Sequence, residues 1–303
     1  MKCLVTGCNG LLGQKLMNCA PVEAELLGVD LQPEPVVSGA RYQRVDLGEA
    51  EQVLAIVRQF RPDWILNTAA FTDVDGAEKN QSLCWRVNVN AVEHLVAACL
   101  ETGARLLHLS TDYVFDGRNG PYSEQDPPNP LGYYGRSKWA GECALQHPSL
   151  HAVIARTMVL YGLGQRVRPN FVTWLIAALR KGQSVRIVTD QFGNTTLADE
   201  LAEALWRMAA LECRGLYHVA GSEIVDRYTF AVKIAGIFDL DADQIQPITT
   251  ADLAQQAPRP LKSGLLVEKA MNELGVRLSD VETGLRRLRE QSQPLSAAVH
   301  RAD

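Results

Sequence analysis

The stretch that decides the fold is Lys2-Cys3-Leu4-Val5-Thr6-Gly7-Cys8-Asn9-Gly10-Leu11-Leu12-Gly13. Its apolar first half is typical of a short buried strand, and residues 14–19 continue it as a helix. Three glycines between a strand and a helix allow a tight turn, a close approach of the backbone to a ligand, and close packing of the helix on the strand. The free N–H groups of the helix start favour a phosphate. The stretch therefore predicts a dinucleotide-binding loop.

The chain beyond this loop alternates between strands and helices. Strands are expected at 25–30, 41–46, 64–67, 105–110 and 152–157, with helices at 49–59, 84–101 and 134–145. Such alternation gives right-handed crossovers and a parallel sheet. After residue 161 the pattern changes to helices at 170–179, 199–211, 228–237, 267–274 and 281–291, with strands at 185–188 and 215–219.

These elements predict an α/β chain, in which a Rossmann-type doubly wound parallel sheet carries a smaller C-terminal α/β lobe that binds substrate. Residues 1–160 are expected to form the dinucleotide-binding domain, and part of 185–220 to complete its sheet. Residues 161–291 should form mainly the substrate-binding lobe. Residues 292–303 are expected to be a disordered tail.

Composition excludes several classes of partner. The chain has 303 residues, of which 30 are Lys or Arg and 35 are Asp or Glu, so its net charge is −5. No basic field attracts nucleic acid or an anionic membrane surface. No apolar run reaches the length of a membrane span, and the strand at the N-terminus leaves no room for a signal peptide. The seven scattered cysteines favour reduced thiols, so a cytoplasmic location is predicted.

Two acids end expected strands near the glycine loop. Asp30 follows Gly7 by 23 residues. A carboxylate there accepts hydrogen bonds from ribose hydroxyls and repels a 2′-phosphate, which favours NAD(H) and leaves NADP(H) as the alternative. A solvated acid at a strand end is the competing interpretation. Asp46 is suited either to contact the adenine amino group or to cap the following helix, and both interpretations stay open.

The candidate catalytic residues are Thr111, Tyr134 and Lys138. Thr111 follows the fifth strand, and a long loop rich in Gly, Asp and Pro separates it from Tyr134. Tyr134 and Lys138 share a helix face, four residues apart. An ammonium beside the phenol would lower the phenol pKa from about 10 and make Tyr134 a usable proton donor near neutral pH. This spacing alone is common by chance, but a strand-end hydroxyl 23 residues upstream makes the combination specific.

At these motifs the chain resembles the extended short-chain dehydrogenase/reductases, and among them the dTDP-4-dehydrorhamnose reductase group. The resemblance covers about residues 2–290. Its motifs are residues 6–14, Asn67-Thr68-Ala69-Ala70-Phe71-Thr72-Asp73-Val74-Asp75, Ser110-Thr111-Asp112-Tyr113-Val114-Phe115-Asp116-Gly117, Tyr134-Gly135-Arg136-Ser137-Lys138, Arg156-Thr157 and Asp190-Gln191-Phe192-Gly193.

The resemblance implies that NAD(P)H gives hydride to the 4-keto group of a nucleotide-linked 6-deoxy sugar. Tyr134 would protonate the substrate oxygen, Thr111 would hydrogen-bond it, and Lys138 would hold the nicotinamide ribose. The candidate cofactor-binding residues are Gly7, Asn9, Gly10, Leu11, Leu12, Gly13, Asp30, Asp46, Leu47, Asn67, Ala69, Ala70, Tyr134 and Lys138. The candidate substrate contacts are Thr72, Val74, Ser110, Asp112, Tyr113, Val159 and Arg259.

The chain departs from the family pattern at three places. Val159 stands where the family has a tryptophan that packs by the sugar, and the Arg259-Pro260 block continues as Leu261-Lys262-Ser263. Some members bind magnesium through a glutamate soon after the glycine loop, but Lys15 stands at that position here. We therefore predict no metal site, and we leave the sugar and the nucleotide unassigned.

Two other functions are compatible with this sequence. One is a different sugar-nucleotide chemistry on the same fold, such as epimerisation. Dehydration is disfavoured because Asp112-Tyr113 follows Thr111, where dehydratases of this fold carry an Asp-Glu pair. The other is a non-catalytic, dinucleotide-binding regulatory subunit of the methionine adenosyltransferase type. The oligomeric state stays open, with a homodimer among the alternatives.

Overall fold

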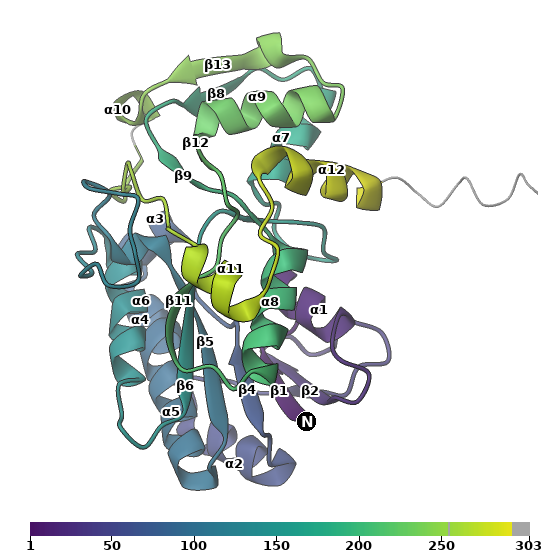
Figure 1. Ribbon diagram of the computed structural model, residues 1–303, viewed down its shortest axis with the longest axis vertical. Coiled ribbons are helices and arrows are strands. Elements are labelled where there is room, and N and C mark those ends of the chain that lie inside the picture. The colour runs from purple at the N-terminus through teal and green to yellow at the C-terminus, as the bar shows by residue number, and fades with distance from the viewer. Residues whose placement is uncertain (254, 293–303) are drawn as a thin grey trace, which may run out of the picture.

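A computed structural model describes residues 1–253 and 255–292 of the chain. Its centre is a sheet of seven parallel strands in the order β11-β6-β5-β4-β1-β2-β3 (Figure 1). The predicted doubly wound parallel sheet is confirmed. Its strands are β1 Lys2–Thr6, β2 Glu25–Asp30, β3 Tyr42–Arg44, β4 Trp64–Asn67, β5 Arg105–Thr111, β6 Ala152–Thr157 and β11 Gly215–His218.

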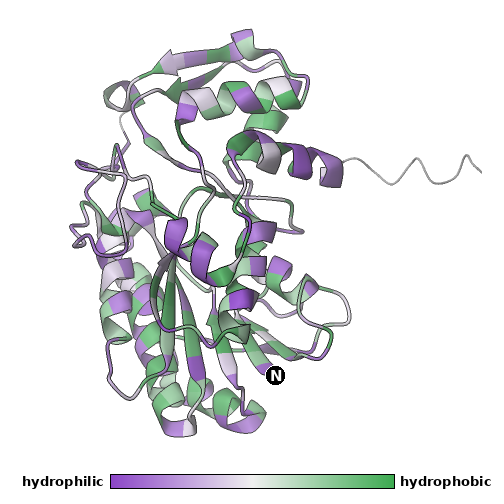
Figure 2. Cartoon of the chain, viewed as in Figure 1, coloured by the Kyte–Doolittle hydropathy of each residue, from purple (hydrophilic) through white to green (hydrophobic). Residues whose placement is uncertain are grey.

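Helices cover both faces of this sheet. On one face, α1 (Leu11–Asn18), α8 (Ala198–Ala210) and α11 (Glu268–Leu274) pack into one apolar core with the strands. On the other face, α2 (Ala50–Phe60), α5 (Ala91–Thr102) and the end of α6 (Tyr133–Ala144) form a second core. The strands are mostly hydrophobic (Figure 2) because parallel strands are buried on both sides. In the described ranges, no helix is long and apolar enough to cross a bilayer.

A second lobe lies beyond the carboxyl ends of the sheet strands (Figure 1). Its core joins α7 (Phe171–Arg180), α9 (Arg227–Ile237) and α12 (Val281–Ser292) to a parallel pair, β8 (Val185–Val188) and β13 (Ile245–Ile248). The lobe therefore covers the sheet edge at which ligands of such folds bind. Short elements complete the chain: β7 Leu160–Tyr161, β9 Phe192–Asn194, β10 Thr196–Leu197, β12 Ile224–Asp226, α10 Thr250–Leu253, and 3-10 turns at Asp112–Val114 and Ala242–Gln244.

Some predicted elements differ from the structure. The helix expected at 84–101 comprises α4 (Gln81–Trp85), a π-helical turn (Arg86–Asn90) and α5. The π turn carries Asn88, whose side chain accepts from Phe71 N at 2.8 Å and donates to Ser137 Oγ at 2.9 Å. A short helix, α3 (Val74–Lys79), occupies a segment to which the sequence analysis assigns no element. Of the expected tail, Ser292 ends α12, and residues 293–303 lie outside the described residues.

Candidate active site

The three candidate catalytic residues meet at the carboxyl end of β5. Thr111 is the last residue of that strand, while Tyr134 and Lys138 lie in the first two turns of α6. All three are buried, and Lys138 is only 2% exposed. The Thr111 side chain contacts the Tyr134 phenol, and the Tyr113 ring packs edge-on against Tyr134 with ring centroids 5.4 Å apart. The site thus contains the hydroxyl groups of Thr111 and Tyr134 and the ammonium group of Lys138, all shielded from solvent.

The pKa of Tyr134 differs from the sequence prediction. Burial raises it above the ordinary value of 10, and the contact with Thr111 only partly opposes this shift. The Lys138 Nζ donates to Leu109 O at 2.7 Å and lies 3.4 Å from His108 Nε2. The predicted net lowering of the phenol pKa is wrong, because burial raises that pKa. Tyr134 is held protonated at neutral pH.

A buried polar chain runs behind Lys138. His108 is fully buried, and its Nδ1 lies 2.9 Å from Asn67 Nδ2 on the neighbouring strand β4. Asn67 Oδ1 accepts from Thr6 Oγ1 at 2.6 Å. Burial, and then the Lys138 charge, lower the His108 pKa, so this imidazole is neutral. Burial also lowers the pKa of Lys138 to about 8. Asn67 is a predicted cofactor-binding residue, and its side chain takes part in this hydrogen-bond network.

Asp112 links the sheet edge to a distant loop. Its Oδ1 accepts from Thr111 Oγ1 at 3.1 Å, and its Oδ2 accepts from Ser263 Oγ at 2.7 Å. Burial raises the pKa of Asp112 to about 6, although both hydrogen bonds oppose that shift. The carboxyl therefore fixes Thr111 against the segment that contains Ser263.

The hydroxyl of Ser110, a predicted substrate contact, is directed to α6 in this structure. Ser110 is buried, and its hydroxyl donates to Glu142 Oε1 on α6 at 2.5 Å. Glu142 also forms a bidentate ion pair with Arg156 on β6, at 2.8 and 2.6 Å. Successive strand residues point to opposite faces, so Ser110 faces α6 when Thr111 faces the site. The Ser110–Glu142–Arg156 cluster holds the helix that carries Tyr134.

A cavity of about 580 Å³ borders the glycine loop. Its walls include Gly7, Gly10 and Leu11 at the start of α1. Gly7 has φ +65°, and a Cβ on Gly13 would lie 2.2 Å from Gly7 O, so both positions require glycine. The other predicted cofactor residues in these walls are Asn9, Asp30, Asp46, Leu47, Ala69 and Ala70. The size and the exposed backbone of the loop fit a dinucleotide.

The two strand-end acids in this cavity also organise its walls. Asp30 accepts from Asn9 N at 3.1 Å and from Leu31 N at 2.8 Å. Asp46 accepts from Arg86 Nη2 at 2.8 Å, and the residue that caps α2 is Glu49. The interpretation of Asp46 as a helix cap is therefore wrong.

Three predicted cofactor residues contribute to packing behind the cavity. Leu12 is buried in the core between α1 and the sheet. Gly13 allows α1 to approach Gly7, and Asn67 is buried at 1% exposure in the polar chain behind Lys138. These three residues therefore lie behind the cavity, toward the protein interior.

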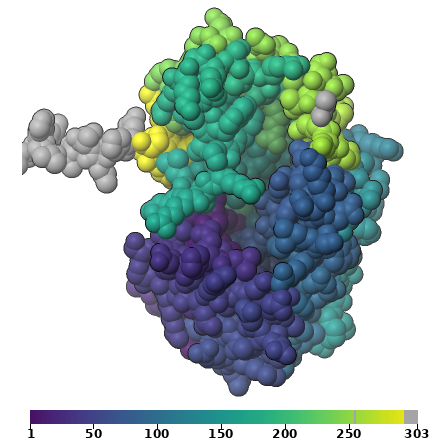
Figure 3. Space-filling view, turned by 180° about the vertical axis from the view of Figure 1, so that it is seen from behind, coloured from purple at the N-terminus to yellow at the C-terminus, as the bar shows by residue number. Residues whose placement is uncertain are grey.

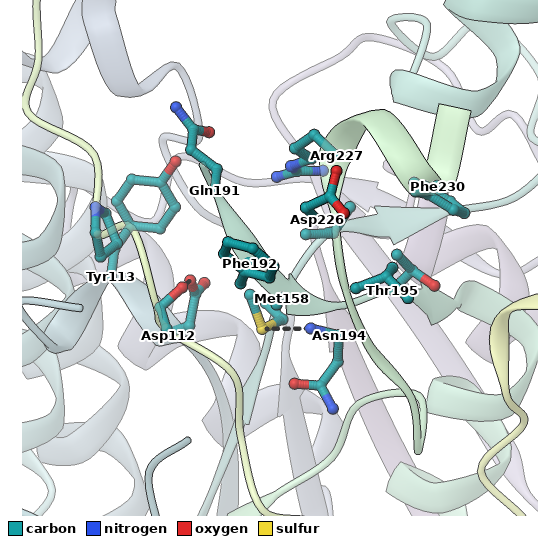
Figure 4. Close-up of a pocket in the computed structure, with 15 residues that line it drawn as sticks. Asp112, Tyr113, Met158, Gln191, Phe192, Asn194, Thr195, Asp226, Arg227 and Phe230 are labelled. Carbon is teal, nitrogen blue, oxygen red and sulfur yellow. Dashed lines mark hydrogen bonds between the residues drawn. The ribbon is translucent and has the colours of Figure 1, made fainter. Parts of the chain in front are cut away.

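Two further cavities lie between the lobes. A narrow one is lined by Asp112, Tyr113, Val159, Thr195 and Arg227. Figure 4 shows Asp112 and Tyr113 across from Thr195 and Arg227. A cavity of about 700 Å³ adjoins it and contains the rings of Phe171 and Trp174. Residues Tyr113, Gln191 and Arg227 line both cavities. The two cavities together can hold a long ligand with polar and aromatic parts.

The remaining predicted substrate residues are divided between sites. Val159 lines the narrow cavity with φ +42°, a conformation that strains a β-branched residue. Arg259 lines the larger cavity and pairs with Asp75 at 2.8 Å. Thr72 instead lies in the wall of the cavity beside the glycine loop. Val74 begins α3 and packs in the apolar cluster around Tyr134.

Several residues of these cavities were not predicted as site residues. Arg227 is the clearest case, because its guanidinium has no carboxylate within 4 Å among the described residues and lies at the junction of both cavities. Trp174 is 42% exposed in the cavity wall. Arg166 and Arg168 line the cavity beside the glycine loop. No local motif marks these four residues, since tertiary folding alone brings them to the cavities.

The position that carries a magnesium-binding acid in some relatives has a different partner here. Lys15 pairs with Asp199 of α8 at 2.9 Å. Across residues 1–253 and 255–292, no group of three or more His, Cys, Asp or Glu side chains is arranged to hold a metal ion.

Comparison with known proteins gives consistent matches along the chain. The family model of the RmlD substrate binding domain matches residues 1–293. A dTDP-4-dehydrorhamnose reductase of Aggregatibacter actinomycetemcomitans is 33% identical, with 96% of this chain and 99% of that protein aligned. A probable low-salt glycan biosynthesis reductase of Haloferax volcanii is also 33% identical, over 94% and 96%.

The solved structures agree with these relatives. The crystal structure of a dTDP-4-dehydrorhamnose reductase from Bacillus anthracis in complex with NADP superposes with a TM-score of 0.87 at 28% identity, covering 96% of this chain and 99% of that one. The crystal structure of a hypothetical dTDP-4-dehydrorhamnose reductase from Sulfolobus tokodaii gives a TM-score of 0.84 at 31% identity, covering 94% of this chain and 99% of that one.

Proposed function

The chain belongs to the RmlD substrate binding domain family, and on that premise we propose that it is an NAD(P)H-dependent reductase of a nucleotide-linked 4-keto-6-deoxy sugar. The observation that carries this proposal is the buried group of Thr111, Tyr134 and Lys138 at the sheet edge, next to a cavity with a glycine loop. The names of the relatives suggest a substrate of the dTDP-4-dehydrorhamnose class.

The cavity beside the glycine loop fits a dinucleotide cofactor. Gly7, Gly10 and Leu11 would hold its phosphates through the backbone, and Asp30 faces the same cavity. When bound there, the reduced nicotinamide supplies the hydride for reduction. The bounds that we propose for the dinucleotide-binding domain are residues 1–160, with part of 185–220 completing its sheet. The substrate lobe then takes most of 161–291.

The protein residues supply the proton and its stabilisation. The phenol of Tyr134, kept protonated by its raised pKa, gives its proton to the substrate oxygen as that oxygen gains negative charge. The Thr111 hydroxyl is placed to hydrogen-bond the same oxygen. The Lys138 ammonium offsets the charge left on the phenolate, and it is positive only below its pKa of about 8. Burial excludes water from all three groups.

The cavities between the lobes suit a nucleotide-linked sugar. Thr195 Oγ1 is buried in the narrow cavity and has no hydrogen-bond partner among the described residues, so a sugar hydroxyl can satisfy it. The Arg227 guanidinium is suited to the diphosphate that links sugar to nucleoside. Phe171 and Trp174 offer aromatic surface to the base. Loss of Arg227 should therefore weaken binding of the nucleotide part.

We propose a preference for NADH, with NADPH as the weaker cofactor. The support is the Asp30 carboxylate in the cavity wall, which would repel a 2′-phosphate. The relative from Bacillus anthracis was crystallised with NADP, so the preference needs direct measurement. Titration of the wild type with both cofactors decides it, and tighter binding of NADPH would contradict the proposal. An Asp30→Ala variant should bind NADPH relatively better.

The direct test of the function is turnover. Purified protein with NADH or NADPH should reduce dTDP-4-dehydrorhamnose, measured as loss of reduced nicotinamide absorbance and as formation of the reduced sugar nucleotide. Tightly retained NAD without net cofactor consumption would favour an epimerase instead. Cofactor binding with no turnover, together with co-purification of a methionine adenosyltransferase, would favour the regulatory subunit.

Two general properties complete the proposal. All seven cysteines are unpaired in the structure, which suits a reducing cytoplasm. A homodimer is compatible with the proposed function, and neither a nucleic acid nor a membrane partner is needed for it. Light scattering at low protein concentration would measure the oligomeric state.

A further inference from the structure

The loop that follows β7 crosses from the second lobe to the glycine loop. Residues 163–168, here called the strap, follow Leu160–Tyr161 and end before Asn170, whose Nδ2 donates to Gly162 O at 2.7 Å and closes the loop. Seen from behind, a teal segment of the second lobe reaches over to the purple N-terminal part beside a hollow in the surface (Figure 3). The strap therefore belongs to the wall of the cavity beside the glycine loop.

Hydrogen bonds fix the strap to the start of α1. Gln165 N donates to Gln14 Oε1 at 2.8 Å, and Gln14 Nε2 donates back to Gln165 O at 2.8 Å. The same Gln14 Nε2 donates to Asn9 O within the glycine loop at 2.7 Å. A Cβ on Gly164 would lie only 3.1 Å from Leu11 Cδ1, so the strap passes directly over the first turn of α1.

The strap brings two unpaired cations to the cavity. Arg166 and Arg168 both line it, and among the described residues neither lies within 4 Å of a carboxylate. Arg166 has φ +53°, an uncommon conformation for a residue with a side chain. Of the acids in the same walls, Asp46 pairs with Arg86, whereas Asp30 accepts from the backbone N–H of Asn9 and keeps its negative charge. The positive charge that no carboxylate offsets within 4 Å lies on the strap, among the described residues.

We propose that the strap binds the pyrophosphate of the dinucleotide from the second lobe, through the guanidinium groups of Arg166 and Arg168. The inference rests on the proposed function insofar as that function places a dinucleotide in this cavity. Guanidinium groups form strong bidentate contacts with phosphate oxygens. Gln14 places the strap over the first turn of α1, where the backbone N–H groups already favour phosphate.

The test measures cofactor affinity without catalysis. The double variant Arg166→Gln/Arg168→Gln, the wild type and a control variant, Arg180→Gln, are titrated with NADH, NADPH and adenosine by fluorescence or calorimetry. Arg180 is an exposed arginine at the end of α7, so its variant makes the same kind of charge change outside the cavity. The double variant should lose roughly 10- to 100-fold in affinity for NADH and NADPH alike. Its affinity for adenosine and all affinities of the control should be unchanged.

The following four outcomes overturn the inference. If the double variant binds NADH as tightly as the wild type, the strap does not bind the pyrophosphate. If affinity is lost for NADPH alone, the two arginines bind the 2′-phosphate. An equal loss for adenosine means that the change disturbs the pocket and not a phosphate contact. If the wild type binds neither NADH nor NADPH, the proposed function fails together with the strap. If the double variant does not fold, the single variants Arg166→Gln and Arg168→Gln are titrated in the same way.

Discussion

Removing the carboxylate of Glu142 should destabilise the whole protein. Glu142 and Arg156 form a bidentate ion pair at 2.8 and 2.6 Å, with side-chain exposures of only 5% and 3%. In Glu142→Ala the guanidinium stays buried without its counter-ion, and Arg156 Nη1 has no partner even in the wild type. Breaking a buried pair in this way costs about 3–5 kcal/mol. For a chain of 303 residues the melting temperature should fall by roughly 5–8 °C.

The assay is equilibrium urea unfolding together with thermal melting, followed by circular dichroism. The matched control is Glu101→Ala, which breaks the bidentate Arg58–Glu101 pair at the surface. Solvent screens that pair, so the control should barely move the midpoint. Replacing both buried partners, as in Glu142→Leu/Arg156→Met, should recover much of the loss, because no unpaired charge then remains. If Glu142→Ala is no less stable than Glu101→Ala, the pair does not fasten α6 to the sheet.

Two further predictions concern the cofactor loop and the active-site lysine. Gly13→Ala would place a Cβ 2.2 Å from Gly7 O, so NADH affinity should fall at least about tenfold, and an unchanged Kd would contradict the tight contact. The Lys138 ammonium is present below a pKa of about 8, so kcat/KM for reduction should fall as pH rises through 8, whereas a flat profile from pH 6 to 10 would contradict its role. Because this folded-state pKa lies below the ordinary 10.5, the wild type should gain stability relative to Lys138→Met as pH rises from 8 to 10.5, as measured by unfolding at each pH.

Local patterns predicted the first half of the fold well. The strand before Gly7, the glycine loop and the helix after it have local causes, since each depends on neighbouring residue types. The π turn at 86–90 has no such cause, because it depends on Asn88 meeting Phe71 and Ser137. Helix α3 is short and contains a glycine, so its residues show no helical periodicity.

The candidate site shows the same division. Thr111, Tyr134 and Lys138 were found because a strand end and a helical spacing of four place them together. The contact of Ser110 with α6 could not be predicted, because the alternation of a strand shows that neighbours face apart but not which of them faces the site. The shift in the Tyr134 pKa depends on burial by segments distant in sequence, as does the meeting of Arg227 with Tyr113. Such effects require the tertiary structure.

The most direct measurement of the central claim compares Tyr134→Phe with Tyr133→Phe in the reduction of dTDP-4-dehydrorhamnose. Tyr133 is the neighbouring tyrosine, and its ring packs near Trp85 with centroids 6.3 Å apart. Tyr134→Phe removes the proton donor and should lower kcat by about 10²- to 10⁴-fold while the Kd for NADH or NADPH stays at the wild-type value. Tyr133→Phe should keep nearly full activity. A Tyr134→Phe variant that reduces the sugar nucleotide at the wild-type rate would show that Tyr134 is not the proton donor.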